Sequence, residues 1–297
     1  MILRIEEMKN ACSKILAAVD SNNLSVLTET LQLKTEGNSL YLSVTNREYF
    51  AKVRLDVDTG TEFHATVNAN LFLKLVAQMT TDTVELNKID NALVIRGNGT
   101  YKLPLVQDND KLLELPEIVI NNPTVNFVIP SDVLLSILQY NSKEITKISV
   151  TKPIHKLYYM DESGAVTFTT GACVNNFKLD QPVKVLLNDR LVKLFKLFKG
   201  EKVNFTLGYD AISDEIIQTK VRFSSDDVTI TAILSCDDSM LRQFPVNAIR
   251  GRADAVYPYS INMNREQLIQ TINRLMLFTT GSNGKELVNP NSTFEFK

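Results

Sequence analysis

Apolar and polar residues alternate along much of the first 106 positions, and two stretches with helical spacing interrupt this pattern. The alternation at 27–58 and 83–106 predicts antiparallel strands. Apolar residues recur three and four positions apart at 6–19 and again at 69–79, which predicts two amphipathic helices. Asn68 directly precedes the second helix and is suited to be its N-cap.

The residues between the predicted strands are typical of tight turns. Gly37-Asn38 and Asp90-Asn91 each separate two alternating runs, and residues 97–99 separate another pair. We therefore expect consecutive strands to pair as hairpins. The resulting order is strand, helix, strands, Asn-capped helix, strands.

The same order begins again after an acidic connector that contains proline. A strand is predicted at 125–130, a helix at 132–144 with Ser131 as its cap, and a second helix after Asn188. Asn188 follows Asn68 by 120 positions. This offset is the length of a domain, so we predict two repeated domains, 1–120 and 121–250.

A third copy starts near Tyr257, where a strand and a helix capped by Asn264 are expected. We predict that residues 251–297 are the beginning of a third, incomplete domain. One helix and two strands could not bury their apolar faces, so either about 75 further residues or another chain would have to complete the domain.

The segment RLVKLFKLFKGEK, at 190–202, places a cation at every third position of an apolar helix. At about 100° per residue, Arg190, Lys193, Lys196 and Lys199 spread over the side opposite the leucines and phenylalanines. Such a face is typical of solvated lysines, of a membrane-surface helix, or of a surface that binds a polyanion.

Charge is divided between the predicted elements. The whole chain carries a net charge of -2, whereas the five predicted helices together carry +3, which leaves -5 for the strands and loops. If the helices share one surface, that surface attracts a polyanion weakly while the remainder repels it. A tight, sequence-specific DNA-binding protein would carry a much stronger basic patch.

Catalytic and metal-binding patterns are not evident. The two histidines, His64 and His155, lie in different repeats, and the acid pairs at 226–227 and 237–238 lack a third ligand nearby. We therefore expect neither an enzyme nor a metal or cofactor site, and we interpret the chain as a binding or scaffolding protein. A nuclease that uses the acid pairs is an alternative.

Composition limits the cellular setting. The chain has 44% hydrophobic and 22% charged residues, no apolar run of membrane-spanning length, and acidic residues where a signal peptide would be basic. Its three cysteines are far apart and are expected to be reduced thiols. We predict a cytoplasmic protein without membrane contact.

Three segments resemble the bacterial-type DNA polymerase III beta sliding clamps, in a divergent form such as a phage encodes. Residues 24–57 resemble the strands of the first clamp domain, and AVTFTTGACVNNFKL at 165–179 resembles a second-domain strand with its T-x-G turn. LRQFP at 241–245 resembles the closing segment of that domain. The resemblance extends over essentially the whole chain as order and pattern.

The resemblance implies an α+β fold, the DNA-clamp fold, with repeated domains in which two helices pack on antiparallel sheets and line a ring. It also implies a processivity factor that encircles double-stranded DNA without sequence preference and tethers the replicative DNA polymerase. A clamp loader and a homo-oligomeric ring, a dimer if the third domain is complete, are the other implied partners. The DNA-facing residues would then be the cations of the predicted helices: Lys9, Lys14, Lys74, Lys143, Lys147, Arg190, Lys193, Lys196, Lys199, Arg265 and Arg274.

Partners of that family insert an apolar peptide between the second and third domains. By position, one wall of this pocket would be formed by Ile154, Thr169, Gly171, Ala172, Cys173 and Val174. Where the family commonly has His-Arg, this chain has Ala172-Cys173. Two alternatives to a bacterial-type clamp are a two-domain trimeric clamp of the archaeal and eukaryotic kind and a β-rich structural protein of a virus.

Overall fold

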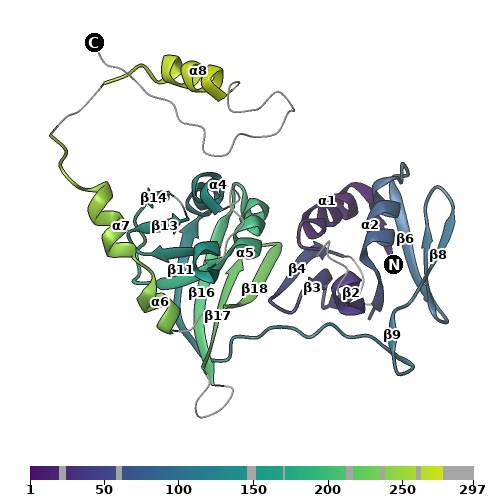
Figure 1. Cartoon of the computed structure of the whole chain (residues 1–297). Helices are drawn as coiled ribbons and strands as arrows, with labels where there is room; N and C mark the ends of the chain where they lie inside the picture. Colours follow the sequence, from purple (N-terminus) through teal and green to yellow (C-terminus); the bar gives the residue numbers. More distant parts are fainter. Residues whose placement is uncertain are drawn as a thin grey trace. The chain divides into compact units, whose positions relative to one another are not determined.

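The computed structural model of the chain describes residues 1–19, 25–57, 62–145, 152–169, 171–211, 217–234, 238–258 and 262–276. The chain forms two units, Met1–Ala253 and Asp254–Lys297 (Figure 1). In the second unit, α8 (Arg265–Met276) begins after Asn264, whose side-chain oxygen accepts the N–H of Glu266 at 3.0 Å, so the predicted cap is confirmed. Lys147, Cys236 and Asp237 lie outside the described residues.

The first half of the large unit has the predicted alternation of helices and hairpins. Its elements are β1 (Ile2–Arg4), α1 (Ile5–Leu16), η1 (Val26–Glu29), β2 (Thr30–Glu36), β3 (Ser39–Thr45), β4 (Tyr49–Asp56), β5 (His64–Asn68), α2 (Ala69–Ala77), β6 (Thr83–Ile89), β7 (Ala92–Arg96), β8 (Thr100–Pro104), β9 (Gln107–Asp108) and β10 (Lys111–Leu112). The hairpin turn at Gly37 is confirmed, with φ of 60° at that glycine. Asn68 caps α2 as predicted, accepting the N–H of Leu71 at 3.0 Å.

The second half repeats this order. Its elements are β11 (Pro123–Pro130), α3 (Ser131–Ser136), η2 (Ile137–Asn141), α4 (Ser142–Ile145), η3 (Pro153–Lys156), β12 (Leu157–Asp161), β13 (Gly164–Phe168), β14 (Ala172–Asn176), β15 (Lys184–Asn188), α5 (Asp189–Lys193), η4 (Leu194–Phe198), β16 (Lys202–Ala211), β17 (Ile217–Ser224), β18 (Val228–Leu234), α6 (Asp238–Gln243) and α7 (Val246–Ala253). Asn188 caps α5 as predicted, accepting the N–H of Leu191 at 2.8 Å.

Three helical predictions in this half were wrong in detail. Ser131 is the first helical residue and Pro130 holds the N-cap position, where its fixed φ of −62° is compatible with the extended ψ of 135°. The continuous helix predicted at 132–144 contains a π-helical turn, η2. The helix that carries the lysines is α-helical only to Lys193 and continues as the 3₁₀-helix η4. Hydrophobic periodicity alone does not distinguish an α-helix, a π-helical turn and a 3₁₀-helix, because each of the three has a buried and an exposed side.

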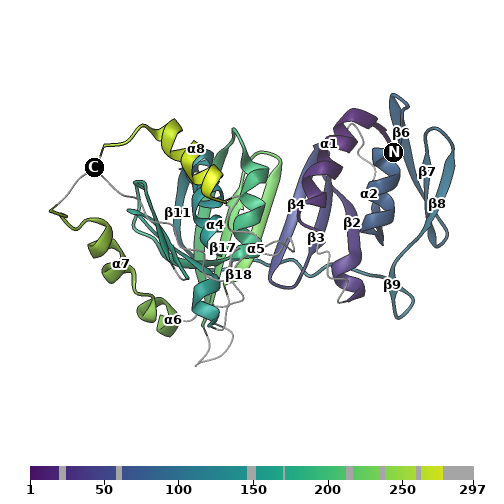
Figure 2. The same ribbon diagram turned by 45° about the horizontal axis from the view of Figure 1, so that its top comes forward.

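Strand pairing joins the two halves. Each half has two four-stranded sheets, and one sheet from each merges into an eight-stranded antiparallel sheet in the order β11-β16-β17-β18-β4-β3-β2-β5. At the junction β18 pairs with β4, with Ile230 opposite Ala51. In both views α1, α2, α4 and α5 lie on the same side of this sheet (Figures 1 and 2). The helices of the two halves therefore share one surface.

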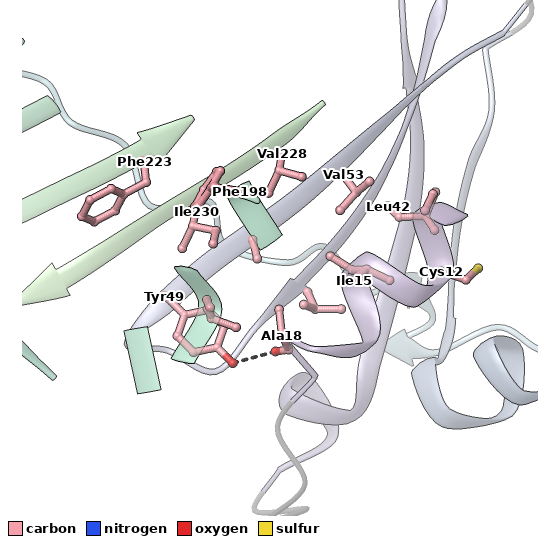
Figure 3. Close-up of a cluster of buried hydrophobic side chains, with 14 of the residues drawn as sticks. Cys12, Ile15, Ala18, Leu42, Tyr49, Val53, Phe198, Phe223, Val228 and Ile230 are labelled. Atoms are coloured by element: carbon pink, nitrogen blue, oxygen red, sulfur yellow. Dashed lines mark hydrogen bonds between the residues drawn. The ribbon is translucent and has the colours of Figure 1, made fainter. Parts of the chain in front are cut away.

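The hydrophobic core is continuous across the junction. Ile15 of α1, Val53 of β4, Ile230 of β18 and Phe223 of β17 belong to one buried cluster and are each at most 1% exposed (Figure 3). The hydroxyl of buried Tyr49 donates to the carbonyl of Ala18 at 2.6 Å, which ties β4 to the end of α1. Such a shared core stabilises the two halves as a unit.

Asp210 on β16 anchors the connector between the halves. Its carboxylate accepts the N–H groups of Asn121 and Asn122 at 3.2 and 3.1 Å and the ammonium of Lys220 at 2.8 Å. The same ammonium donates to the carbonyl of Val119 at 2.8 Å. The hydrogen bond from Lys220, followed by those from the two backbone N–H groups, lowers the pKa of Asp210 below its ordinary value.

Acidification should therefore weaken this anchor. Because the pKa of Asp210 is lower in the folded chain than in the unfolded chain, its stabilising contribution is complete above about pH 3.9 and is lost as the pH falls through the folded pKa. Asp210→Asn should lower the free energy of unfolding at neutral pH by about 1–3 kcal/mol and flatten its dependence on pH below 4. Thermal unfolding midpoints from pH 2 to 7 measure both effects. Parallel curves for the two proteins would contradict the assignment.

Candidate nucleic-acid interface and partner pocket

The segment from α5 to η4 presents its cations to solvent and its apolar residues to the core. Leu191, Leu194, Phe195 and Phe198 are buried at 0–2% exposure. The side chains that alternate with them are exposed: Arg190, Lys193, Lys196 and Lys199. The apolar side covers the strands of its own half, so this segment has no second apolar face for a membrane.

The 3₁₀ winding changes how the lysines are arranged. Residues three apart eclipse each other in a 3₁₀-helix, with a rise of about 6 Å per turn, whereas in an α-helix they would fan out by about 60°. Lys193 is the N-cap of η4, Lys196 lies within it, and Lys199 is its C-cap. The three lysines therefore form a row along one edge, which we call the lysine row. The ammonium of Lys193 also lies 2.5 Å from the carboxylate of Asp189, one turn earlier in α5.

Lys14 of α1 has a different environment from the lysine row. Its ammonium lies 2.5 Å from the carboxylate of Asp227 and 3.5 Å from that of Glu201, both of which belong to the second half. Burial by itself would lower the pKa of Lys14, but the hydrogen bond and charge of Asp227, together with Glu201, raise it above its ordinary value. Lys14 thus connects the halves across the junction, a role that its position in the sequence did not indicate.

Arg190 adds a second ionic contact between the halves. Its guanidinium lies 3.8 Å from the carboxylate of Glu48, which precedes β4. Both side chains are 42% exposed, so this pair contributes little to stability. Its position nevertheless places the start of α5 beside the junction.

The remaining predicted DNA-facing residues are distributed over both units. In the large unit, Lys74 of α2 and Lys143 of α4 are exposed, and Lys9 of α1 is half-buried. In the second unit, Arg265 and Arg274 of α8 are exposed. Each unit therefore carries some of the predicted cations.

The predicted pocket wall is divided between the two faces of the sheet β12 to β15. Ile154 and Val174 pack in one cluster with Phe168 of β13. Because side chains alternate along a strand, Ala172 lies on the same face as Val174, and Cys173 lies on the opposite face. Burial, and then the charge of Glu144, raise the pKa of the Cys173 thiol. The sequence placed Cys173 in the apolar wall, whereas the structure turns it toward the helices.

The chain after the large sheet supplies residues that sequence reasoning missed. Phe244 is 4% exposed; its ring centroid lies 5.0 Å from that of Phe168 and 5.2 Å from that of Tyr159. Val246 and Ile249 pack on the same cluster. The apolar residues of LRQFP were a signal that could have placed this segment on the sheet.

A partly buried ion pair holds α7 over this face. The guanidinium of Arg250 donates to both carboxylate oxygens of Asp161, at 2.7 and 2.9 Å. Burial opposes the charged form of Asp161, but the hydrogen bond from Arg250 and the N–H of Ser163 outweigh it and lower its pKa. This pair and Phe244 hold α6 and α7 beside Ile154 and Val174.

The two histidines and Cys12, which are candidates for catalysis or metal binding by residue type, have surroundings that the structure describes. His64 lies in β5, and the rings of His155 and Phe168 are nearly perpendicular, with their centroids 4.8 Å apart. Burial raises the pKa of the Cys12 thiol to about 12. Within the described residues, no three His, Cys, Asp or Glu side chains are grouped so as to hold a metal ion. In the same part of the chain, no helix has the length and apolar character needed to cross a membrane.

Comparison with known proteins gives a consistent picture. No protein-family model matches the chain. A beta sliding clamp of Mycoplasmopsis pulmonis is 27% identical over 138 residues, which are 44% of this chain and 34% of that protein. The chain thus spans about a third of that relative's length.

Solved structures match over nearly the whole chain. The DNA polymerase III subunit beta of Pseudomonas aeruginosa has 16% identity and a TM-score of 0.70, covering 95% of this chain and 75% of that one. A putative DNA polymerase III beta subunit of Eubacterium rectale has 13% identity and a TM-score of 0.76, covering 95% and 74%. The predicted α+β clamp fold is confirmed. This chain has the fold of the bacterial DNA polymerase III beta sliding clamps and is similar to one of them in sequence.

Proposed function

We propose that this chain is a DNA polymerase processivity factor, a sliding clamp that encircles duplex DNA and tethers a polymerase to it. The observation that carries the proposal is the exposed lysine row, which continues directly from α5, one of the helices of both halves that lie on one side of the eight-stranded sheet (Figure 1). Weak contacts between lysines and phosphates are independent of base sequence and permit sliding. In a ring, retention comes from topology, so a stronger basic lining is not needed.

Strand edges support a ring. The junction uses β18 of the second half and β4 of the first half. Their counterparts in the repeat are β8 and β14, and each has a partner on one side only among the described strands. An edge strand with free backbone groups is a template for further pairing. The same kind of junction can therefore be repeated at both ends to close a homo-oligomeric ring.

The proposed partners are duplex DNA, a DNA polymerase and a clamp loader. A solved structure of the Helicobacter pylori beta clamp, 16% identical with a TM-score of 0.69, is bound to a DNA ligase peptide. We assign such a peptide to the wall around Ile154 and Val174, where Phe168 and Phe244 add apolar surface. In this role the chain is not a catalyst, and it acts on DNA in the cytoplasm.

Retention on closed DNA tests the proposal. The protein is loaded on nicked circular DNA, washed at a salt concentration that removes non-specific binders, and treated with an enzyme that linearises the circle. A clamp should remain on the circle and leave after linearisation. The proposal would be overturned if the protein stays bound after the circle is linearised, or if the salt wash removes it from the intact circle. Light scattering gives the number of subunits and separates a dimer from a trimeric ring.

A further inference from the structure

The helix that ends at Ile145 is hydrogen-bonded to the turn of the proposed partner wall. One carboxylate oxygen of Glu144, in α4, accepts the hydroxyl of Thr169 at 2.8 Å and the N–H of Gly171 at 3.1 Å. The Thr169 hydroxyl also lies 3.3 Å from the main-chain oxygen of Glu144. Thus a single acidic side chain holds both described ends of the turn between β13 and β14.

Gly171 is fitted to this carboxylate. A Cβ atom at residue 171 would lie 3.2 Å from the same oxygen of Glu144, closer than ordinary van der Waals contact. The N–H of Thr169 also donates to the carbonyl of Gly171 at 2.9 Å, which closes the turn. The Thr and Gly of the T-x-G pattern therefore have a structural partner, Glu144, which the sequence pattern does not contain.

Asn141 supports the same hairpin from one turn earlier. It is 0% exposed, and its amide nitrogen lies 3.3 Å from the carbonyl of Cys173 and 3.3 Å from the hydroxyl of Thr167. Asn141 ends the π-turn η2, and the wider winding of such a turn shifts the direction of the residues that follow. Asn141 and Glu144 thus both reach the strands from the helix side.

The apolar side of the wall depends on this attachment. Ala172 and Val174 follow the turn directly, and β14 has a neighbouring strand, β13, on one side only among the described strands. Glu144 lies on the helix side of the sheet, whereas Val174 packs with Ile154 and Phe168 on the opposite side. Glu144 therefore has no direct contact with a peptide bound against that apolar side.

We propose that Glu144 is a positioning residue for the partner-peptide wall: by holding the Thr169–Gly171 turn, it sets where β14 presents Ala172 and Val174. The inference rests on the proposed function, because it assigns a role within the pocket of a clamp. It predicts that peptide affinity depends on the position of the carboxylate oxygen of Glu144 and does not depend on the negative charge of that side chain.

Three substitutions separate these two properties. Glu144→Gln keeps an oxygen at the same reach, Glu144→Asp keeps the charge but withdraws the oxygen, and Glu144→Ala removes both. Glu162, an exposed acid in the turn between β12 and β13, provides the matched control Glu162→Ala. The probes are a DNA ligase peptide of the kind bound by the Helicobacter pylori clamp and griselimycin, which a Pseudomonas aeruginosa clamp binds.

The affinity of each probe should decrease about tenfold in the Ala and Asp variants, and it should change less than about threefold in the Gln and Glu162→Ala variants. Retention on circular DNA should be unchanged in all four. Thermal unfolding identifies any variant that does not fold, and the Asp variant carries the test if the Ala variant fails.

The possible failures are distinguishable. If the unsubstituted protein binds neither probe, the proposed pocket fails, whatever the variants do. If it binds and the Ala and Asp variants bind equally well, Glu144 has no positioning role. An equal loss in the Gln variant would show that charge, rather than acceptor position, is what matters, and would also overturn the inference.

Discussion

Lys193→Glu combined with Lys196→Glu should reduce the affinity for duplex DNA at least tenfold while leaving the fold intact. Both side chains are exposed in the lysine row, so their replacement removes only the ion pair between Lys193 and Asp189, which at 55% and 25% side-chain exposure contributes little to stability. Two lost phosphate contacts, at about 0.7 kcal/mol each, correspond to this factor, and the repulsion by two new carboxylates adds to it.

Salt dependence distinguishes loss of phosphate contacts from general damage. Each lysine that neutralises a phosphate contributes about 0.9 to the slope of log K against log salt, so the double variant should have a slope smaller by about 1.8. Fluorescence anisotropy with a duplex of arbitrary sequence measures the slope. Thermal unfolding of the same samples should give midpoints that differ by only a few degrees, because the exposed Lys193–Asp189 pair contributes little to stability.

A matched control has the same change in charge elsewhere. Lys178 and Lys184 are exposed and lie outside the helices: Lys178 precedes β15, and Lys184 is its first residue. Lys178→Glu with Lys184→Glu should therefore alter DNA affinity much less. If both double variants bind DNA equally weakly, the effect comes from net charge. If the lysine-row variant binds like the unsubstituted protein at low salt, the helices do not face DNA.

Phe223→Ala should lower the free energy of unfolding by about 3–5 kcal/mol. Phe223 is 0% exposed on β17, and its ring centroid lies 4.9 Å from that of Phe195 and 5.2 Å from that of Phe205. Removal of the ring leaves a cavity that the neighbouring strands, paired on both sides, cannot close.

The continuous core leads to a second prediction for Phe223→Ala. Since one buried cluster extends from Phe223 to Ile15 across the junction, both halves should lose stability together. Circular dichroism during denaturation is suitable, because the chain has no tryptophan to report on one site. The control is Ile217→Ala on the same strand, where the side chain is 68% exposed and the expected change is within about 0.5 kcal/mol. If the first half of the Phe223→Ala variant unfolds at the same midpoint as in the unsubstituted protein, the two halves do not share one core.

Local features were predictable because local residues decide them. The caps at Asn68 and Asn188 need only a side-chain oxygen and the next turn of backbone, and both hydrogen bonds are present. The turns at Gly37 and Asp90 are those of the structure, with φ of 60° and 50°. The repeat with an offset of 120 was visible because each half buries its own helices with the same spacing.

Other features depend on residues far apart along the chain. Lys14 and Asp227 are 213 positions apart, and nothing in either neighbourhood indicates their contact. The division of the pocket wall, with Cys173 opposite Val174, required knowing which strand carries them. Likewise, the contact between Glu144 and Thr169 depends on a π-turn that a hydrophobic pattern does not record.

By itself, the sequence determined the repeat, the caps, the hairpins and the side of each helix that faces the core, because apolar spacing and turn chemistry act within a few residues. The tertiary structure alone decided that β4 and β18 merge the halves into one sheet, that the lysine row follows a 3₁₀ path, and that Lys14 pairs across the junction. The physical reason is that backbone pairing, helix winding and ion pairs respond to the packed surroundings, which distant segments supply.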